Sequence, residues 1–106
     1  MIDNCKLLAY NCCVDIEAIS HKALRRFVET GNERGVPELI RVRRMIAFLL
    51  AAETEDDFRV PPNFGAHMLA GDRAGTWSLI VTRNWRMTFK VNEDGAIVDL
   101  DLEDYH

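Results

Sequence analysis

The sequence predicts an α+β fold, with an N-terminal strand and a helical hairpin packed on a mainly antiparallel sheet of four or five strands. Two segments, at 21–30 and 37–52, have the apolar spacing of amphipathic helices. Short segments rich in strand-forming residues follow after residue 60, separated by turn residues. A strand, two helices and then a run of strands is typical of an α+β domain with its helices on one face of the sheet.

The first strand and the first helix are expected between residues 14 and 31. Val14–Ile19 alternates apolar and polar residues, as a half-buried strand does. Ser20 is suited to cap a helix over 21–30, and Gly31 is suited to end it. The apolar side of this helix is formed by Leu24, Phe27 and Val28.

The second helix is expected to begin with Pro37 in its first turn and to run to about Ala52. Its buried stripe consists of residues spaced three and four apart: Leu39, Val42, Ile46 and Leu49. Thr54–Asp57 resembles a capped turn, and Pro61-Pro62 favours an extended connector.

Four strands are expected in the second half of the chain, at about 66–69, 76–82, 85–91 and 96–102. Arg83-Asn84 and Asn92–Gly95 are suitable hairpin turns between the last three strands. Trp77 and Phe89 are expected in the core.

Composition places the chain among ordinary soluble globular proteins. Its 106 residues suffice for one domain, with 48% hydrophobic and 28% charged residues. The longest uncharged apolar run, Met45–Ala52, is too short to span a bilayer. The N-terminus lacks the pattern of a signal peptide, so a cytoplasmic location without membrane contact is expected. A net charge of −4 argues against broad binding of naked nucleic acid.

Three cysteines, Cys5, Cys12 and Cys13, lie within the first thirteen residues. Their odd number and the adjacency of two of them argue against a disulfide framework. A zinc site formed by these cysteines with His21 is conceivable, but the preferred interpretation is that the thiols have no specific role. No metal or cofactor is expected. Residues 1–13 differ in composition from the rest and are interpreted as an extension of unknown role, before a domain at 14–106.

From His21 to His106 the chain resembles the HigB-type toxins of the RelE superfamily. The resemblance rests on the segments HKALRRFVETG (21–31), AHMLAGDRAGTWS (66–78), RNWRMTF (83–89) and LEDYH (102–106). It implies a compact sheet like that of microbial RNases and cleavage of messenger RNA in the ribosomal A site. It also implies neutralisation by a HigA-like helix-turn-helix antitoxin, with operator DNA bound only through that antitoxin.

The resemblance assigns the catalytic positions to four residues: His67, Asp104, Tyr105 and His106. RNA cleavage through the 2′-hydroxyl needs a base, an acid and groups that stabilise charge on phosphorus. Histidine suits either proton role near neutral pH. With the terminal carboxylate and Asp104 favouring its charged form, His106 suits the acid, and His67 is then the base, although the two roles could be reversed.

Arg73 and Arg86 are expected to bind the scissile phosphate. Each also has a structural interpretation, because Arg73 could pair with Asp72 at a turn and Arg86 could stack on Trp85. The helix cations could contact ribosomal RNA or the antitoxin, or simply be solvated: Lys22, Arg25, Arg26, Arg41 and Arg44.

One position departs from the family pattern, since Ala70 stands where many relatives have a lysine. Its loss removes a phosphate-neutralising cation, and slow cleavage is therefore expected. The alternative function is a catalytically weak or inactive binding module, acting through antitoxin complex formation and operator co-repression.

Overall fold

The computed structural model describes residues 16–104. The expectations for Val14, for the cysteines, and for Tyr105 and His106 lie outside the described residues. Along the described part the elements are α2 (Lys22–Thr30), α3 (Leu39–Ala51), the 3₁₀ helix η1 (Glu55–Arg59), β1 (His67–Met68), the 3₁₀ helix η2 (Gly71–Arg73), β2 (Thr76–Ile80), β3 (Trp85–Val91) and β4 (Ile97–Asp104).

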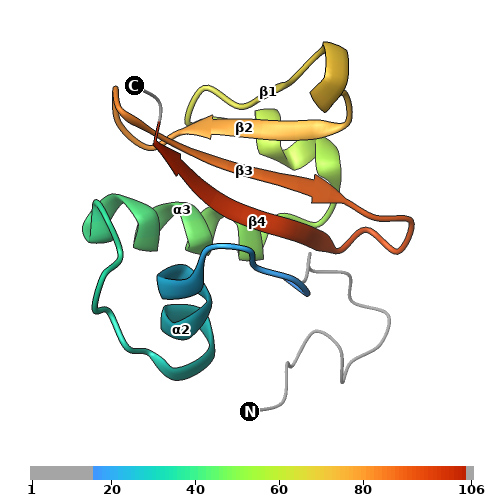
Figure 1. Cartoon of the computed structure of the whole chain (residues 1–106). Helices are drawn as coiled ribbons and strands as arrows, with labels where there is room; N and C mark the ends of the chain where they lie inside the picture. The colour runs from blue at the N-terminus through green and yellow to red at the C-terminus, as the bar shows by residue number, and fades with distance from the viewer. Residues whose placement is uncertain (1–15, 105–106) are drawn as a thin grey trace.

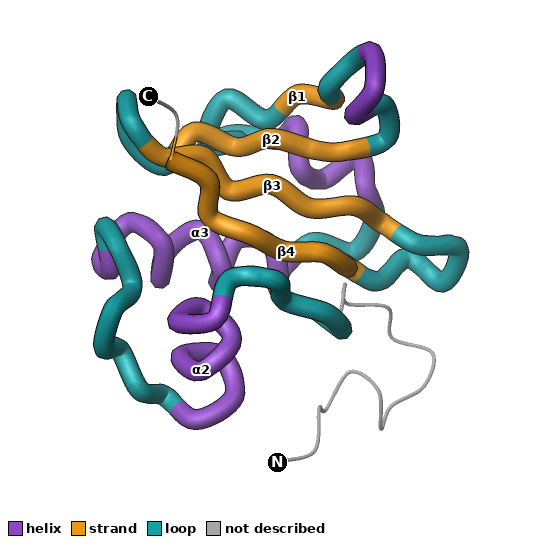
Figure 2. Tube along the Cα trace, viewed as in Figure 1, coloured by secondary structure: helices purple, strands orange, loops and turns teal. Residues whose placement is uncertain are grey.

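The four strands form one antiparallel sheet in the order β1-β2-β3-β4 (Figures 1 and 2). This arrangement, with both helices contributing to a single core, confirms the predicted α+β fold. The predicted strand at 85–91 agrees with β3. The strand predicted at 76–82 ends early, at Ile80, because the amides of Val81 and Thr82 both donate to the carbonyl of Trp85 in the hairpin turn.

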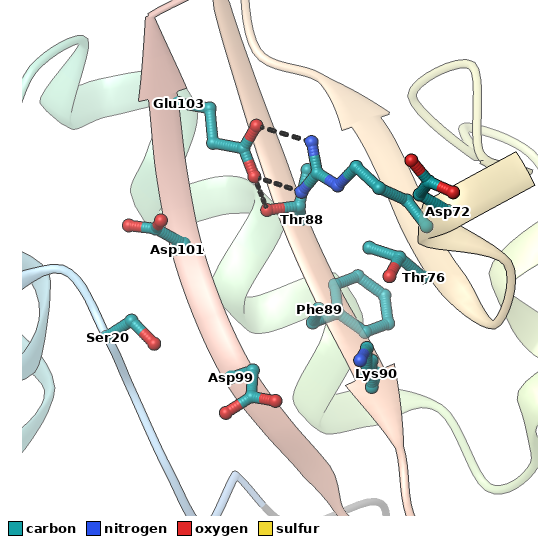
Figure 3. A pocket seen from close by; sticks show the side chains of 10 residues that line it. Ser20, Asp72, Thr76, Thr88, Phe89, Lys90, Asp99, Asp101 and Glu103 are labelled. Carbon is teal, nitrogen blue, oxygen red and sulfur yellow. Dashed lines mark hydrogen bonds and ion pairs between the residues drawn. The ribbon is translucent and has the colours of Figure 1, made fainter.

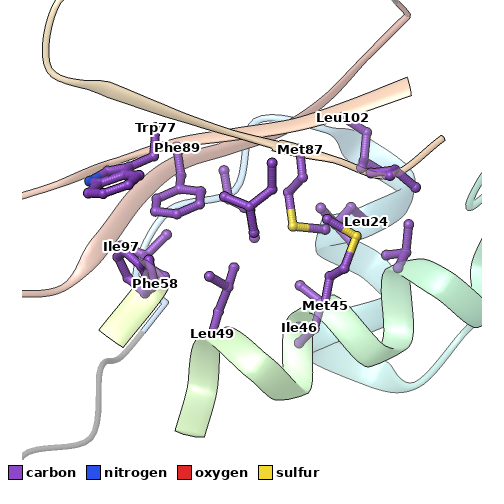
Figure 4. Close-up of a cluster of buried hydrophobic side chains, with 14 of the residues drawn as sticks. Leu24, Met45, Ile46, Leu49, Phe58, Trp77, Met87, Phe89, Ile97 and Leu102 are labelled. Carbon is purple, nitrogen blue, oxygen red and sulfur yellow. The ribbon is translucent and has the colours of Figure 1, made fainter. Parts of the chain in front are cut away.

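The core lies between α3 and one face of the sheet (Figure 4). Leu49 and Met45 of α3 face Met87 and Phe89 of β3, and all four side chains are fully buried. The predicted stripe of the second helix is therefore confirmed, as is the burial of Trp77. Among the described residues, no helix is long and apolar enough to cross a membrane.

The segment before α2 is not the regular strand that alternation predicted. Ile16 and Ile19 make isolated parallel bridges to Ile97 and Leu100 of β4. These two isoleucines are half-buried against the core, whereas Ala18 is exposed. Because the inward residues are three apart, the segment cannot have the two-residue period of a strand.

Three further local predictions are wrong. The side chain that caps α2 is His21, whose Nδ1 accepts from the amide of Leu24, because the helix begins one residue later than predicted, at Lys22. The amide of Ser20 donates to the carbonyl of Leu100 in β4. Pro37 precedes α3, since the left-handed conformation of Glu38 (φ 50°) separates it from the helix.

The third concerns Pro61-Pro62, which lies in a turn with a cis peptide bond instead of an extended connector. Val28, predicted on the apolar side of the first helix, is exposed. Two other local predictions agree with the structure. Gly31 ends α2 in the left-handed conformation, and the Asp57 carboxylate accepts from the amides of Glu53 and Thr54 in the capped turn.

Candidate active site

The candidate site lies on the face of the sheet that points away from the helices, here called the open face. Residues paired across antiparallel strands project to the same side. His67 pairs with Ser78, which pairs with Thr88. Two residues before Thr88 on β3, Arg86 pairs with Glu103. Since Met87 and Phe89 point into the core, these alternate residues share the open face.

An ion pair between distant segments crosses this face (Figure 3). Arg73, from η2, donates from Nη1 to Oε1 of Glu103 at 2.9 Å and from Nη2 to Oε2 at 2.5 Å. The hydroxyl of Thr88 donates to the same Oε2 at 2.6 Å. Arg73 is therefore paired with Glu103 on β4, not with the neighbouring Asp72 that the sequence offered.

The ion pair with Arg73 lowers the pKa of Glu103. The hydrogen bonds from Arg73 lower the pKa of this carboxyl below its usual value of 4.5, and the Thr88 hydroxyl and the charge of Arg73 act in the same direction. Partial burial opposes them without reversing the result. Glu103 is thus a carboxylate at neutral pH, held by two partners.

Beside the pair lies a polar hollow of about 260 Å³. It is lined by Ser20, Asp72, Arg73, Thr76, Thr88, Phe89, Lys90, Asp99, Asp101 and Glu103 (Figure 3). Four of these side chains are acidic and two are basic, so the hollow has an excess of negative charge. A phosphate group would meet two cations here, one of them already paired with a carboxylate.

A break in the β3–β4 register shapes the hollow. Thr88 pairs with Asp101, but Lys90 pairs with Val98, so β4 has one extra residue in this interval. Asp99 lies in this β-bulge, where its backbone is left-handed (φ 55°), and it is exposed. The alternation of inward and outward residues along β4 is consequently interrupted at Asp99.

Arg86 lies at the start of β3, and its Nη1 donates to three main-chain carbonyls, two in the preceding turn and one in the first residue of the strand. The acceptors are Thr82 at 2.6 Å, Arg83 at 3.1 Å and Trp85 at 3.2 Å. The guanidinium of Arg86 therefore stabilises the β2–β3 hairpin. The Cα atom of Arg86 lies opposite that of Glu103 on β4.

His67 is exposed on β1, with Nδ1 3.0 Å from the carbonyl oxygen of Gly65. His67 and Arg86 are two strands apart in the sheet and are offset by two residues along the strand direction. This places their Cα atoms roughly 12 Å apart. Asp104 is exposed at the end of β4, opposite Trp85. The predicted approach of His106 to these groups concerns a residue outside the described range and stays a prediction.

The basic side chains of the helices are exposed. Lys22, Arg25 and Arg26 line the outer side of α2. Arg41 and Arg44 of α3 border a shared surface hollow of about 540 Å³. Arg41 also has a structural role, because its Nε donates to the carbonyl of Val81 and its guanidinium lies 5.7 Å from the centre of the Phe64 ring.

Sequence reasoning did not single out Glu103 or Thr88. A signal for both existed in the strand periods, since each alternates with core residues and therefore belongs to the open face. No local pattern in the sequence indicates the contact of Glu103 with Arg73, which lies thirty residues away.

Within residues 16–104, no group of three or more His, Cys, Asp or Glu side chains could hold a metal ion. His21, the described member of the conceivable zinc site, uses its Nδ1 as a helix cap. The three cysteines of that site lie outside the described residues.

Comparison with known proteins defines the class. A model of the family described as "RelE-like toxin of type II toxin-antitoxin system HigB" matches residues 17–106. The chain is 39% identical over 95 residues to the protein of Proteus vulgaris named Endoribonuclease HigB, covering 86% of this chain and 99% of that protein.

The protein is therefore a RelE-like toxin of a type II toxin–antitoxin system. More specifically, the chain belongs to the HigB-like toxin family. A structure of a YoeB/ParE toxin from Agrobacterium tumefaciens is also similar, with a TM-score of 0.45 and 16% identity, covering 84% of this chain and 95% of that one.

Proposed function

We propose that this toxin is an endoribonuclease that cleaves messenger RNA in the ribosomal A site, without a metal or cofactor. The family match and the 39% identity to a protein named Endoribonuclease HigB support RNA as the substrate. In the proposed reaction a 2′-oxygen attacks the adjacent phosphorus, the bond to the 5′-oxygen breaks, and a cyclic phosphate remains.

His67 and His106 are proposed to carry the two protons. One imidazole accepts the 2′-hydroxyl proton, and the other, as an imidazolium, donates a proton to the departing 5′-oxygen. The charge of Asp104 is proposed to favour the imidazolium of His106. Tyr105 stacks on a base or donates to phosphate, and Arg86 stabilises charge on the phosphorane together with Arg73.

The β3–β4 register is the observation that most supports this arrangement. Arg86 pairs with Glu103, and Trp85 pairs with Asp104. The strand that leads into Tyr105 and His106 therefore ends beside the strand start that carries Arg86. His67 is on the same open face, at a separation that side chains from both sides and a phosphate between them can span.

The proposed partner is a HigA-like helix-turn-helix antitoxin, with operator DNA reached only through it. The toxin–antitoxin family supports an antitoxin partner. The exposed cations of the helices are proposed contacts with the ribosome or the antitoxin: Lys22, Arg25, Arg26, Arg41 and Arg44.

A second candidate function is a binding module with little or no catalysis. The acidic excess of the polar hollow favours it, because a phosphate must approach four carboxylates. The absence of a cation at Ala70 favours it as well.

Induction of the protein in growing bacteria distinguishes the two functions. For the nuclease, we expect growth arrest and new messenger ends mapping to the ribosomal A site, both reversed by co-expression of the adjacent antitoxin gene. The chain lacking Tyr105 and His106 is the matched control and is expected to cause no arrest. Normal growth and intact transcripts, together with tight antitoxin binding, would favour the binding module.

A further inference from the structure

The strongest unassigned feature is the contact of Glu103 with Arg73 on the open face, and the inference drawn from it rests on the proposed nuclease function. The contact uses both oxygens of one carboxylate and both terminal nitrogens of one guanidinium. Such bidentate pairs fix orientation as well as distance.

Thr88 makes the carboxylate a defined anchor. Its side chain is buried on β3, with 3% exposure, and its hydroxyl donates to the oxygen that also accepts from Arg73 Nη2. Glu103 itself is only one quarter exposed. The guanidinium is thus attached to the rigid β3–β4 ladder and not only to its own loop.

The position of the anchor connects it to the proposed chemistry. Glu103 lies one residue before Asp104 and directly opposite Arg86. The carboxylate therefore holds Arg73 near the end of β4, opposite Arg86 and next to Asp104. A guanidinium that is already oriented has no reorganisation to undergo as charge develops on phosphorus.

The same carboxylate opposes substrate binding. It is one of four acidic side chains around the polar hollow, and its charge offsets that of Arg73. A negative charge near the incoming phosphate weakens RNA binding, whereas correct placement of Arg73 speeds the chemical step. The two effects change different kinetic constants and can be separated.

We propose that Glu103 is a positioning residue of the nuclease: with Thr88 it orients Arg73 toward the scissile phosphate, and it thereby raises the cleavage rate at the expense of RNA affinity. Its action passes through Arg73, because Glu103 is expected to repel the phosphate instead of binding it.

Single-turnover cleavage of a defined messenger on programmed ribosomes tests this proposal. Measured over a range of toxin concentrations, Glu103→Gln is expected to lower the maximal rate roughly 10- to 100-fold, because Arg73 loses its charged anchor. The toxin concentration for half-maximal rate is expected to fall about fivefold, because one repulsive charge is removed. A purely structural role would not move the two constants in this manner.

Two controls complete the test. Asp101→Asn removes a carboxylate from the same hollow and the same strand, and should lower the half-maximal concentration without changing the maximal rate. Arg73→Gln is expected to abolish the effect of Glu103→Gln on the maximal rate, so that the double variant is no slower than Arg73→Gln alone.

Thr88→Val decides the outcome should Glu103→Gln fail to fold. This variant keeps every charge and removes only the hydroxyl donor, and a several-fold lower maximal rate with an unchanged half-maximal concentration is expected. The proposal would be overturned if Thr88→Val and Glu103→Gln both cleaved at the wild-type maximal rate. It would also be overturned if the effects of Glu103→Gln and Arg73→Gln on the maximal rate were additive in the double variant. Neither outcome would contradict the proposed nuclease function. A wild-type chain that never cuts the messenger overturns both proposals.

Discussion

The two faces of the sheet are built from the same strands but are stabilised in different ways. On the helix-facing side, Trp77, Leu79, Met87 and Phe89 are at most 1% exposed and pack into one apolar cluster. On the open face, most alternate residues of the same strands are polar, with Ile80 as an exception, and an ion pair from a distant loop joins two of the elements. The first face depends on burial and the second on directional bonds.

This difference indicates how the protein divides stability from function. Burial of apolar area is non-directional and supplies most of the stabilising free energy. Hydrogen-bonded ion pairs near the surface contribute little net stability, but they fix where a charge is held. Substitutions on the helix-facing side should therefore change unfolding, and substitutions on the open face should change cleavage.

The largest effect is expected from Phe58→Ala. Phe58 is fully buried, with its ring centre 5.5 Å from that of Trp77 and 5.2 Å from that of Phe89. Truncation leaves a cavity beneath the sheet and should lower the free energy of unfolding by about 3–5 kcal/mol, as measured in urea. Val60→Ala, at a half-exposed position nearby, is the control and should change it by less than about 0.5 kcal/mol. Equal urea midpoints for the two variants would contradict the assigned core.

A second prediction concerns His67→Gln on the open face. His67 is exposed, so the urea midpoint should not change. Loss of its proposed proton transfer should slow messenger cleavage by at least about 100-fold. Met68→Gln, on the adjacent residue of β1, is the matched control and should cleave at the wild-type rate. Undiminished cleavage by His67→Gln would remove this residue from the catalytic assignment.

The smallest effect is expected from acid. The folded state lowers the pKa of Glu103 below 4.5, so its pair with Arg73 stabilises the fold above the unfolded-state pKa. That contribution is lost as the pH falls through the lower, folded-state value. The difference in unfolding free energy between the wild type and Glu103→Gln should therefore be greatest near neutral pH and shrink below about pH 4.5. A pH-independent difference would show that the ion pair contributes nothing to stability.

Local patterns predicted much of the fold but misplaced some element ends. The stripe on α3, the left-handed Gly31 and the strand at 85–91 were all correct, because each depends on neighbours in the sequence. Ser20 fits a helix cap by its chemistry, yet its amide pairs with β4, and His21 becomes the cap. The segment at 16–20 likewise follows the edge of β4 instead of its own alternation.

For the candidate site, the sequence supplied the residue types and the structure supplied their neighbours. Arg73 was predicted as a phosphate ligand or as a partner of Asp72; the phosphate role stays a prediction, and in the structure the guanidinium bonds to Glu103. No short-range pattern could indicate this, since the two residues belong to elements that meet only after β2, β3 and β4 have paired.

By itself the sequence determined the apolar stripe of α3, the burial of Trp77 and Phe89, and which family the chain resembles, because apolar periodicity and motif spacing are properties of the linear chain. Only the tertiary structure decided which charges are joined across the open face. Hydrophobic burial requires no particular partner, whereas an ion pair requires two side chains brought together by strand register, and that register is set by the whole sheet.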